Sequence, residues 1–473
     1  MIDKQQKPIE QLKRTLTLRD LVLFNLVTVI SLTSLAIVAN SGIAGLTLLI
    51  IGAIFFFIPQ GLAVNELSSN YPEEGGIYAW TKLLLGNGHG FLCGWCYWIN
   101  NVLFYPTSVM GTAVIATYVI NKSNSTTGSS LTFILPFTLV ALWLAAILNM
   151  IGMKKGKWLQ NIGAICNYIP FIILAILGIY TFVTHSSANS FAAINWKLDF
   201  STFSSLNLWA VIPFAYAGLE LSATLGNEIK DPTRNLPRSV LIAAPFIALF
   251  YLVGSGSLLY IVPKESIDVI GGAFQAINIS VNRIDNSLWW IASLAAAFAA
   301  IGRIGGLGAW ITGSARVAFV VGLDKYFPPA FGRIHPRWHT PHIAILIQTI
   351  LATIFLLMAI LGKGTTVEAA FLILLDMSII LYFIPYVYLF ICFLKHYYQA
   401  HVPKVKMPFG KTGAIIIGSS GLMITFFAMF VAMIPPPGTN PWLFEIKVIA
   451  GSLILILLGG YFYRRGNRLK SLT

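Results

Sequence analysis

The chain has 473 residues, of which 57% are hydrophobic and only 10% are charged, and its mean hydropathy is +0.77. Soluble domains carry about 25% charged residues, so this composition excludes a soluble enzyme or binding module. Runs of the ~20 apolar residues that cross a bilayer as a helix recur along the whole chain. The ~10-residue alternating segments of a membrane barrel do not occur.

In chain order, the hydrophobic pattern predicts an all-α membrane protein with twelve transmembrane helices. The predicted spans are residues 20–40, 46–68, 91–120, 131–152, 158–183, 206–226, 239–261, 287–315, 342–362, 367–394, 411–434 and 442–463. Segments 1–19 and 464–473 flank them, and we expect both to be cytoplasmic.

The basic residues are divided unevenly between the two sides of these spans. Of the 31 Lys and Arg residues, 24 fall on the side of both chain ends, six fall on the other side, and Arg303 lies within a span. Lys and Arg concentrate in cytoplasmic loops, which places both termini in the cytoplasm. The net charge of +14 therefore reflects topology and not nucleic-acid binding. Compact loops favour a bacterial inner membrane.

The sequence contains few motifs that resemble cofactor-binding, redox or metal sites. The sequence has no Walker A or Rossmann fingerprint, so we expect no cofactor and no enzymatic reaction, and gradients would supply the energy for transport. Cys93 and Cys96 of "CGWC" lie at the start of an apolar helix and are interpreted as small packing residues. His335, His339 and His342 lie in a basic loop and are interpreted as part of a solvated connector, not a metal site.

Two spans carry signs of interruption. In lipid, a helix breaks only where protein or a water-filled cavity satisfies the freed backbone groups. The sixth span, "LWAVIPFAYAGLELSATLG", contains Pro213, Gly218 and Glu220 within eight positions, which favours a broken helix. The first span, "NLVTVISLTSLAIVAN", has a row of small hydroxyl residues that suits either a break or a plain packing face. Matching interruptions in two halves indicate an inverted repeat with a midplane site.

Three segments, in this order, resemble the amino acid–polyamine–organocation superfamily of permeases. They are "AVNELSSNYPEEGGIYAW", "FAYAGLELSATLGNEIKDPTRNLPRS" and "GGLGAWITGSARVAFVVGLDKYFPPAFGRIHPRWHTP". The similarity covers nearly the whole chain, and bacterial glutamate/GABA and arginine/agmatine antiporters look most alike in these segments. The resemblance implies a LeuT-like five-plus-five inverted repeat, over residues 20–183 and 206–394, followed by two additional helices in 411–463.

The resemblance also implies a substrate site. The α-carboxylate would meet backbone N–H groups near Ser31, Thr33 and Ser34, although the family's usual Gly-x-Gly break is replaced here by "SLTS". The other positions implied to bind substrate are Phe214, Ala215 and Tyr216, with Gly218 at the break, Asn101 and Tyr105 on the third span, and Trp310 as the inner gate. Glu220 matches the family's acid for gating or proton coupling, and Asp376 is a second candidate.

Arg303 is the one charge in "FAAIGRIGGLGAWITG". At ~1.5 Å per residue it lies near the middle of its span, too deep to reach either surface, so it should face a cavity or a partner. Three interpretations stay open. Arg303 forms an ion pair with Glu220 or Asp376, or it replaces a bound sodium ion, or it attracts an acidic substrate and repels a cationic one.

The sequence thus predicts a secondary active amino acid transporter, either an antiporter or a proton-coupled symporter, that works by alternating access. Its expected partners are a small-molecule amino acid, acidic or neutral, the lipid bilayer and, for coupling, protons, while the oligomeric state stays open. The alternatives are a transporter of cationic amino acids or polyamines and a non-transporting amino acid sensor of the same fold.

Overall fold

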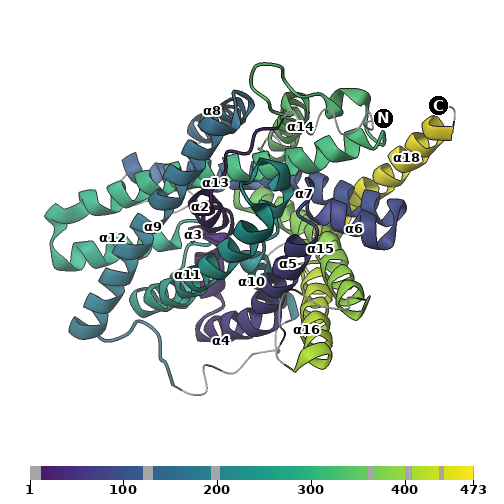
Figure 1. Ribbon diagram of the computed structural model, residues 1–473. Coiled ribbons are helices and arrows are strands. Elements are labelled where there is room, and N and C mark those ends of the chain that lie inside the picture. The colour runs from purple at the N-terminus through teal and green to yellow at the C-terminus, as the bar shows by residue number, and fades with distance from the viewer. Residues whose placement is uncertain are drawn as a thin grey trace.

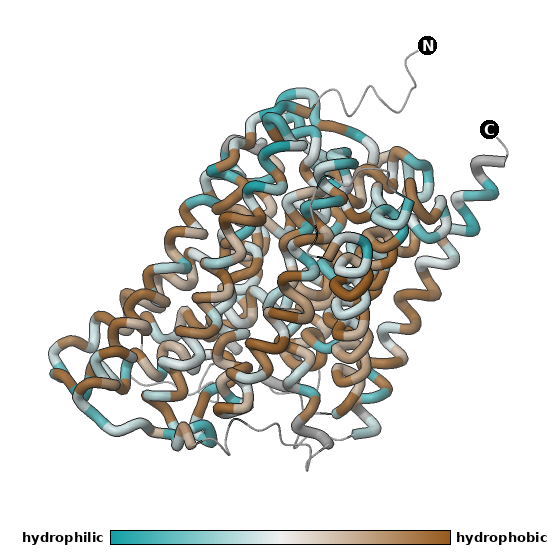
Figure 2. Tube along the Cα trace, turned by 60° about the horizontal axis from the view of Figure 1, so that its bottom comes forward, coloured by the Kyte–Doolittle hydropathy of each residue, from teal (hydrophilic) through white to brown (hydrophobic). Residues whose placement is uncertain are grey.

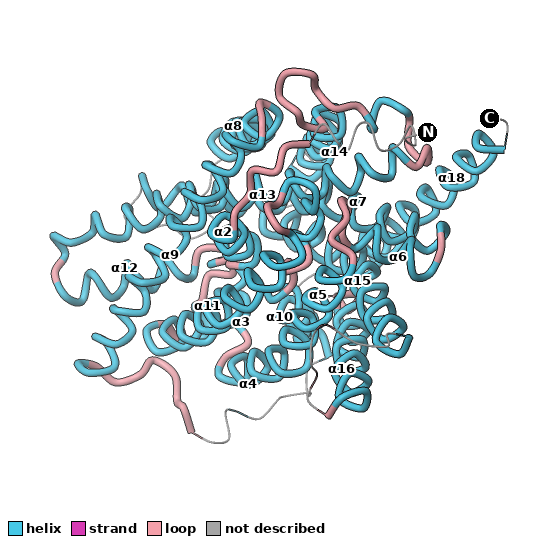
Figure 3. Tube along the Cα trace, in the orientation of Figure 1, coloured by secondary structure: helices cyan, strands magenta, loops and turns pink. Residues whose placement is uncertain are grey.

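The computed structural model describes residues 12–120, 131–192, 196, 203–360, 367–399, 404, 407, 409–435 and 441–471. These residues form a bundle of helices (Figures 1 and 3). Apart from one isolated bridge between Leu16 and Ile229, the described part of the chain contains no β-structure. The all-α fold class predicted from the sequence is therefore confirmed.

Eleven described segments are long and apolar enough to cross a membrane. Their helices are α2 (Leu18–Val29) with α3 (Leu32–Asn40), α4 (Ile43–Gly52) with α5 (Ile58–Asn70), α7 (Asn87–Ile120), α8 (Leu131–Met150), α9 (Met153–Thr184), α11 (Pro232–Ile261), α13 (Trp290–Leu323), α14 (His342–Ile360), α15 (Val367–Gln399), α16 (Gly410–Val431) and α18 (Gly451–Ser471). Short π-helical turns lie within the second and last of these segments, at η1 (Ala53–Phe57) and at η9 (Ile446–Ala450), which follows α17 (Pro441–Glu445).

The predicted sixth span consists of three short pieces and is not among the eleven. They are η4 (Phe203–Ala210), α10 (Val211–Tyr216) and η5 (Leu221–Glu228). The remaining helices lie in connections, at α6 (Ile77–Leu85), η6 (Lys264–Ser266), α12 (Gly272–Ile284), η7 (Asn286–Trp289) and η8 (Pro329–Gly332). The hydrophobic pattern predicts neither α6 nor α12. It also predicts an end of the eighth span at residue 315, before a charge, whereas α13 continues because Arg316 is buried against Glu228.

Hydrophobic residues cover the sides of the bundle, and hydrophilic residues gather towards the end where both termini lie (Figure 2). Large apolar side chains are exposed along the outer helices, including Ile179 and Met423, as expected of surfaces that face lipid. We call the end with the termini the inner end. The first described residues pair there with the end of η5, through the N–H of Thr15 and the carbonyl of Glu228 (2.9 Å).

Helix α13 runs through the middle of the bundle and packs against α9 and α7. It approaches α9 closely at two glycines: a Cβ on Gly305 would lie 2.6 Å from the Cα of Gly163 and 2.8 Å from the carbonyl oxygen of Leu159. Small residues permit such close backbone contact between membrane helices.

We therefore expect Gly305→Ala to destabilise the protein by about 1–3 kcal/mol, the usual cost of overpacking. Gly256→Ala is the matched control, because Gly256 also lies within a long helix but has no atom within 4 Å of the position of an added Cβ. Thermal melting of the detergent-solubilised protein should show a lower midpoint for the first variant only. Equal midpoints for the two variants would contradict the close contact.

Candidate functional site

The first span is broken in the middle by two extended residues. Helix α2 ends at Val29, Ile30 and Ser31 have ψ angles of 125° and 114°, and α3 begins at Leu32. The Ser31 hydroxyl caps α3 by accepting a hydrogen bond from the N–H of Ser34 (3.2 Å). The hydroxyl row therefore marks a break and not a plain packing face, because serine supplies the cap that a new helix start needs.

The sixth span breaks at the same level of the bundle. Helix α10 ends at Tyr216, Ala217 is extended, and Gly218 adopts φ +124°, a conformation that other residues rarely take. The buried amide of Gln60, on α5, lies beside the freed backbone groups. In the amide orientation that satisfies both of its polar atoms, its nitrogen donates to the carbonyl of Tyr216 and its oxygen accepts from the N–H of Leu219, each at 3.1 Å. Such partners allow a break inside a membrane protein.

A cavity of about 70 Å³ lies between the two breaks. Its lining includes most of the site residues expected from the sequence, namely Ser31, Thr33, Ser34, Phe214, Ala215, Arg303 and Trp310. The lining includes the start of α3 and the end of α10, and such helix ends carry N–H groups and carbonyls, respectively, that lack partners within the helix. The cavity therefore offers donors for a carboxylate and acceptors for an ammonium group.

Four aromatic side chains form one wall of the cavity. Phe104 packs edge-on against Phe214 and Trp310, with centroid distances of 6.0 and 5.6 Å, and Tyr382 packs against the same two rings at 5.8 and 5.7 Å. The indole N–H of Trp310 donates to the carbonyl of Thr28 (3.1 Å), just before the first break. These contacts fix the indole between the cavity and the inner end.

Helix α7 contributes a different face from the one expected. The cavity is lined by Asn100, Phe104 and Ser108, at the i, i+4, i+8 spacing of one helical face. Asn101 and Tyr105, the pair expected to face the substrate, each follow a lining residue by one position and do not line the cavity. Both pairs have the same spacing, so the sequence contains no signal that separates the two faces.

Arg303 reaches into the cavity from α13 and bonds to neutral oxygens. Its guanidinium donates to the hydroxyls of Thr33 (3.0 Å) and Thr112 (3.2 Å) and to the carbonyl of Ser108 (3.3 Å), and it lies 3.5 Å from the hydroxyl of Ser31. No ion pair among the described residues includes Arg303. Neutral partners leave its positive charge uncompensated beside the cavity.

Glu220, directly after the break in the sixth span, is fully buried among tyrosines. Its carboxylate accepts hydrogen bonds from the hydroxyls of Tyr97 (3.0 Å), Tyr382 (2.6 Å) and Tyr386, and from the N–H of Gly218 (3.2 Å). Tyr382 also lines the cavity. Glu220 is thus linked to the cavity through one phenol and does not contact Arg303.

Four other expected residues lie outside the cavity lining. Asn101 donates to the carbonyl of Tyr97 (2.7 Å), Tyr105 donates to the carbonyl of Trp310 (3.3 Å), and Tyr216 donates to that of Leu49 (3.3 Å). Gly218 forms the break itself.

Asp376, the second candidate coupling acid, is buried on α15, near Leu375 of the lining. One of its carboxylate oxygens has no hydrogen-bond partner among the described residues. Like Glu220, it makes no ion pair with Arg303 within the described part of the chain. The predicted ion pair of Arg303 with Glu220 or Asp376 is therefore not present in the described structure.

The family model described as amino acid permease matches residues 16–457. The chain belongs to the amino acid permease family, within the amino acid–polyamine–organocation superfamily. An uncharacterized transporter of Legionella pneumophila is 30% identical to this permease, and the match covers 96% of this chain and 97% of the relative.

More distant relatives carry named activities. The glutamate/gamma-aminobutyrate antiporter of Lactococcus lactis is 24% identical, with 82% of this chain and 77% of the relative covered. The serine/threonine exchanger of Bacillus subtilis is 26% identical, with 68% and 71% covered. Among solved structures, MhsT in complex with L-phenylalanine superposes with a TM-score of 0.64 at 14% identity, over 87% of this chain and 98% of that one. These matches confirm the superfamily and the LeuT-like fold, and they identify the chain as a multi-pass membrane protein of a transporter family.

Proposed function

We propose that the chain is a secondary active transporter that binds an amino acid between the broken first and sixth spans and works by alternating access. The observation that carries this proposal is the cavity enclosed by both breaks. The start of α3 and the end of α10 meet there, and helix ends of these two kinds suit the carboxylate and the ammonium group of an amino acid. The gates are the Phe214 and Trp310 rings, and Glu220 is the coupling acid, with Asp376 as the second candidate.

The proposed topology follows the resemblance described above. Residues 20–183 and 206–394 form two inverted five-helix repeats, 411–463 adds two helices, and the inner end faces the cytoplasm of a bacterium. The break in each half supports this division. Antiport and proton symport are both compatible with it.

We further propose that acidic or neutral amino acids are preferred over cationic ones. Arg303 supports this choice because its hydrogen bonds to hydroxyls do not neutralise it. A substrate carboxylate could replace those hydroxyls and form a charge-assisted fork. A cationic side chain at the same place would meet a like charge.

Arg303→Gln is therefore expected to lower glutamate uptake at least about tenfold, because a hydrogen bond to a charged group contributes about 1.5–3 kcal/mol. The measurement is uptake of labelled glutamate into proteoliposomes preloaded with substrate. Arg283→Gln is the matched control, since Arg283 is exposed at the end of α12. Unchanged glutamate uptake by Arg303→Gln would remove Arg303 from the substrate site.

The test of the whole proposal compares uptake of glutamate, a neutral amino acid, arginine and agmatine, with and without internal substrate and a pH gradient. Saturable uptake of glutamate or the neutral amino acid is expected. Selective uptake of arginine or agmatine would favour the cationic alternative, and tight binding without uptake would favour a sensor.

A further inference from the structure

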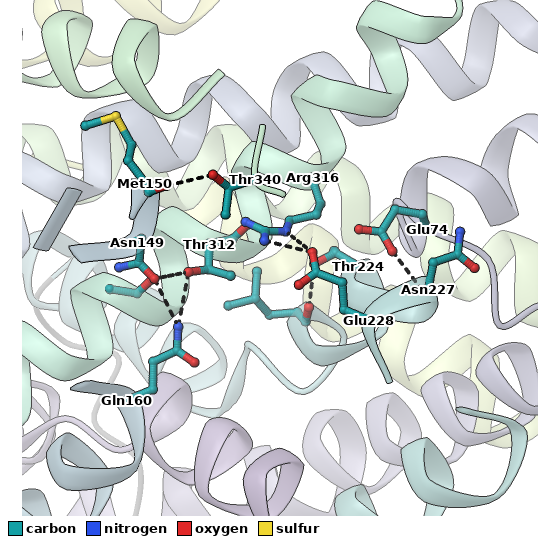
Figure 4. Close-up of polar contacts among 12 residues, drawn as sticks. Glu74, Asn149, Met150, Gln160, Thr224, Asn227, Glu228, Thr312, Arg316 and Thr340 are labelled. Atoms are coloured by element: carbon teal, nitrogen blue, oxygen red, sulfur yellow. Dashed lines mark hydrogen bonds and ion pairs between the residues drawn. The ribbon is translucent and has the colours of Figure 1, made fainter. Parts of the chain in front are cut away.

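The inner end contains a buried ion pair that joins the sixth span to α13. Arg316 donates to a carboxylate oxygen of Glu228 through Nε (2.9 Å) and lies 2.7 Å from it through Nη2, and each side chain is only 1% exposed (Figure 4). A further N–H of Arg316 donates to the carbonyl of Thr312 (3.1 Å). One buried cation and one buried anion are thus matched here.

A second carboxyl group reaches the same place from the loop between α5 and α6. Glu74 is buried, and one of its oxygens accepts from the N–H of Asn227 (2.8 Å), while the other has no hydrogen-bond partner in the described structure. Figure 4 shows it beside the ion pair. The loop is held against η5 by the N–H of Gly75, which donates to the carbonyl of Thr224 (3.0 Å). These hydrogen bonds therefore fix Glu74 relative to η5, the last piece of the broken sixth span.

The other charged and titratable groups that face Glu74 are already paired or exposed. They line an adjoining cavity of about 570 Å³. Lys82 binds Asp324 at 2.7 Å, and Tyr78 donates to the same carboxylate. Glu73 lies on the exposed side of the loop. The described residues therefore supply no second cation for Glu74.

Two buried carboxyl groups and one guanidinium leave one negative charge without compensation if both acids are ionised. Burial is the main reason that the pKa of Glu74 rises to about 8, the nearby carboxylate of Glu228 raises it further, and Arg316 opposes the rise. A buried acid of this kind takes up a proton instead of remaining charged.

We infer that Glu74 is a proton-binding site of the inner end: it holds a proton while its loop, η5 and α13 are packed together, and it releases the proton when that end opens to water. The ligand is a proton from the side that faces the inner end. This site is separate from Glu220, which lies at the level of the cavity and makes no contact with Glu74.

The sign of the effect follows from the two protonation states. In the packed arrangement the pKa of Glu74 is about 8, and in contact with water it would return towards its ordinary value of 4.5. Between these values, opening releases a proton. Acid pH therefore stabilises the closed inner end, and this stabilisation is lost as the pH rises through about 8.

The test uses the full-length protein in nanodiscs and reads the site without substrate. Infrared difference titration should reveal a carboxyl group that ionises near pH 8 in the wild type and in Glu73→Gln, but not in Glu74→Gln. Hydrogen exchange of segments 71–76 and 224–228, compared between variants at each pH, should increase across that range only where Glu74 is present. Glu74→Ser is a second neutral variant in case the amide disturbs folding.

Absence of the pH 8 step in the wild type, or its persistence in both Glu74 variants, would overturn the inference. So would exchange of the two segments that changes with pH equally in all variants. The inference depends on the proposed transport function only for its physiological consequence. If no amino acid is transported, the proposed function fails, while the infrared and exchange measurements still decide the proton site.

Discussion

Arg316→Met is expected to destabilise the protein by about 3–5 kcal/mol, because removing one partner of a buried ion pair leaves the other charge without compensation. Glu228 would remain buried, with Glu74 beside it and no described cation in reach. The pair also joins η5 to α13, so its loss should loosen the inner end. A buried carboxylate that has lost its partner takes up a proton instead of remaining charged, so the loss should be smaller at acid pH.

The apparent melting temperature in detergent, measured between acid and alkaline pH, checks this expectation. Arg234→Met is the matched control because Arg234 is exposed on α11. The double variant Arg316→Met/Glu228→Met should be more stable than Arg316→Met alone, since neither charge is then left unpaired. A double variant as unstable as the single one would show that packing, and not charge, explains the loss.

Glu220→Gln is expected to lower substrate exchange at least about tenfold and to flatten its dependence on pH. Three tyrosine hydroxyls and one N–H donate to this carboxylate, whereas an amide has one acceptor oxygen and adds an NH₂ that faces other donors. Leaving buried donors unsatisfied costs about 1–3 kcal/mol each. Because Tyr382 also lines the cavity, the disturbance should reach the substrate.

Exchange in proteoliposomes at several pH values measures this effect. Glu265→Gln serves as the control, because Glu265 is exposed in the loop after α11. Tyr382→Phe should produce part of the Glu220→Gln effect by removing one donor and one contact to the cavity. A wild-type rate and pH profile for Glu220→Gln would exclude Glu220 from coupling and leave Asp376 as the candidate.

The spans could be predicted because their signal is local. A run of about 20 apolar residues is a helix in lipid whatever it packs against. The interruption near Gly218 was also readable, since proline and glycine change the backbone directly. The break at Ser31 was harder to predict, because serine permits a helix or a cap and the neighbouring chain decides between them.

The face of α7 that lines the cavity could not be predicted. Asn100 and Phe104 share the spacing of Asn101 and Tyr105, and only packing against α13 and α15 determines which pair faces inward. The environment of Arg303 was undetermined for the same reason. Its depth followed from its position along the helix, but its hydroxyl partners come from α3 and α7.

By itself, the sequence determined that this protein is a helical membrane permease whose sixth span is interrupted, because hydrophobic runs, helix-breaking residues and family motifs are all properties of neighbouring residues. Only the tertiary structure decided that Arg303 has no carboxylate partner in the described chain, that Glu220 lies among three tyrosines, and that Glu74 lies beside the Glu228–Arg316 pair. These groups come from segments far apart in the chain, and the balance of charge in a buried cluster depends on which of them the packing brings together.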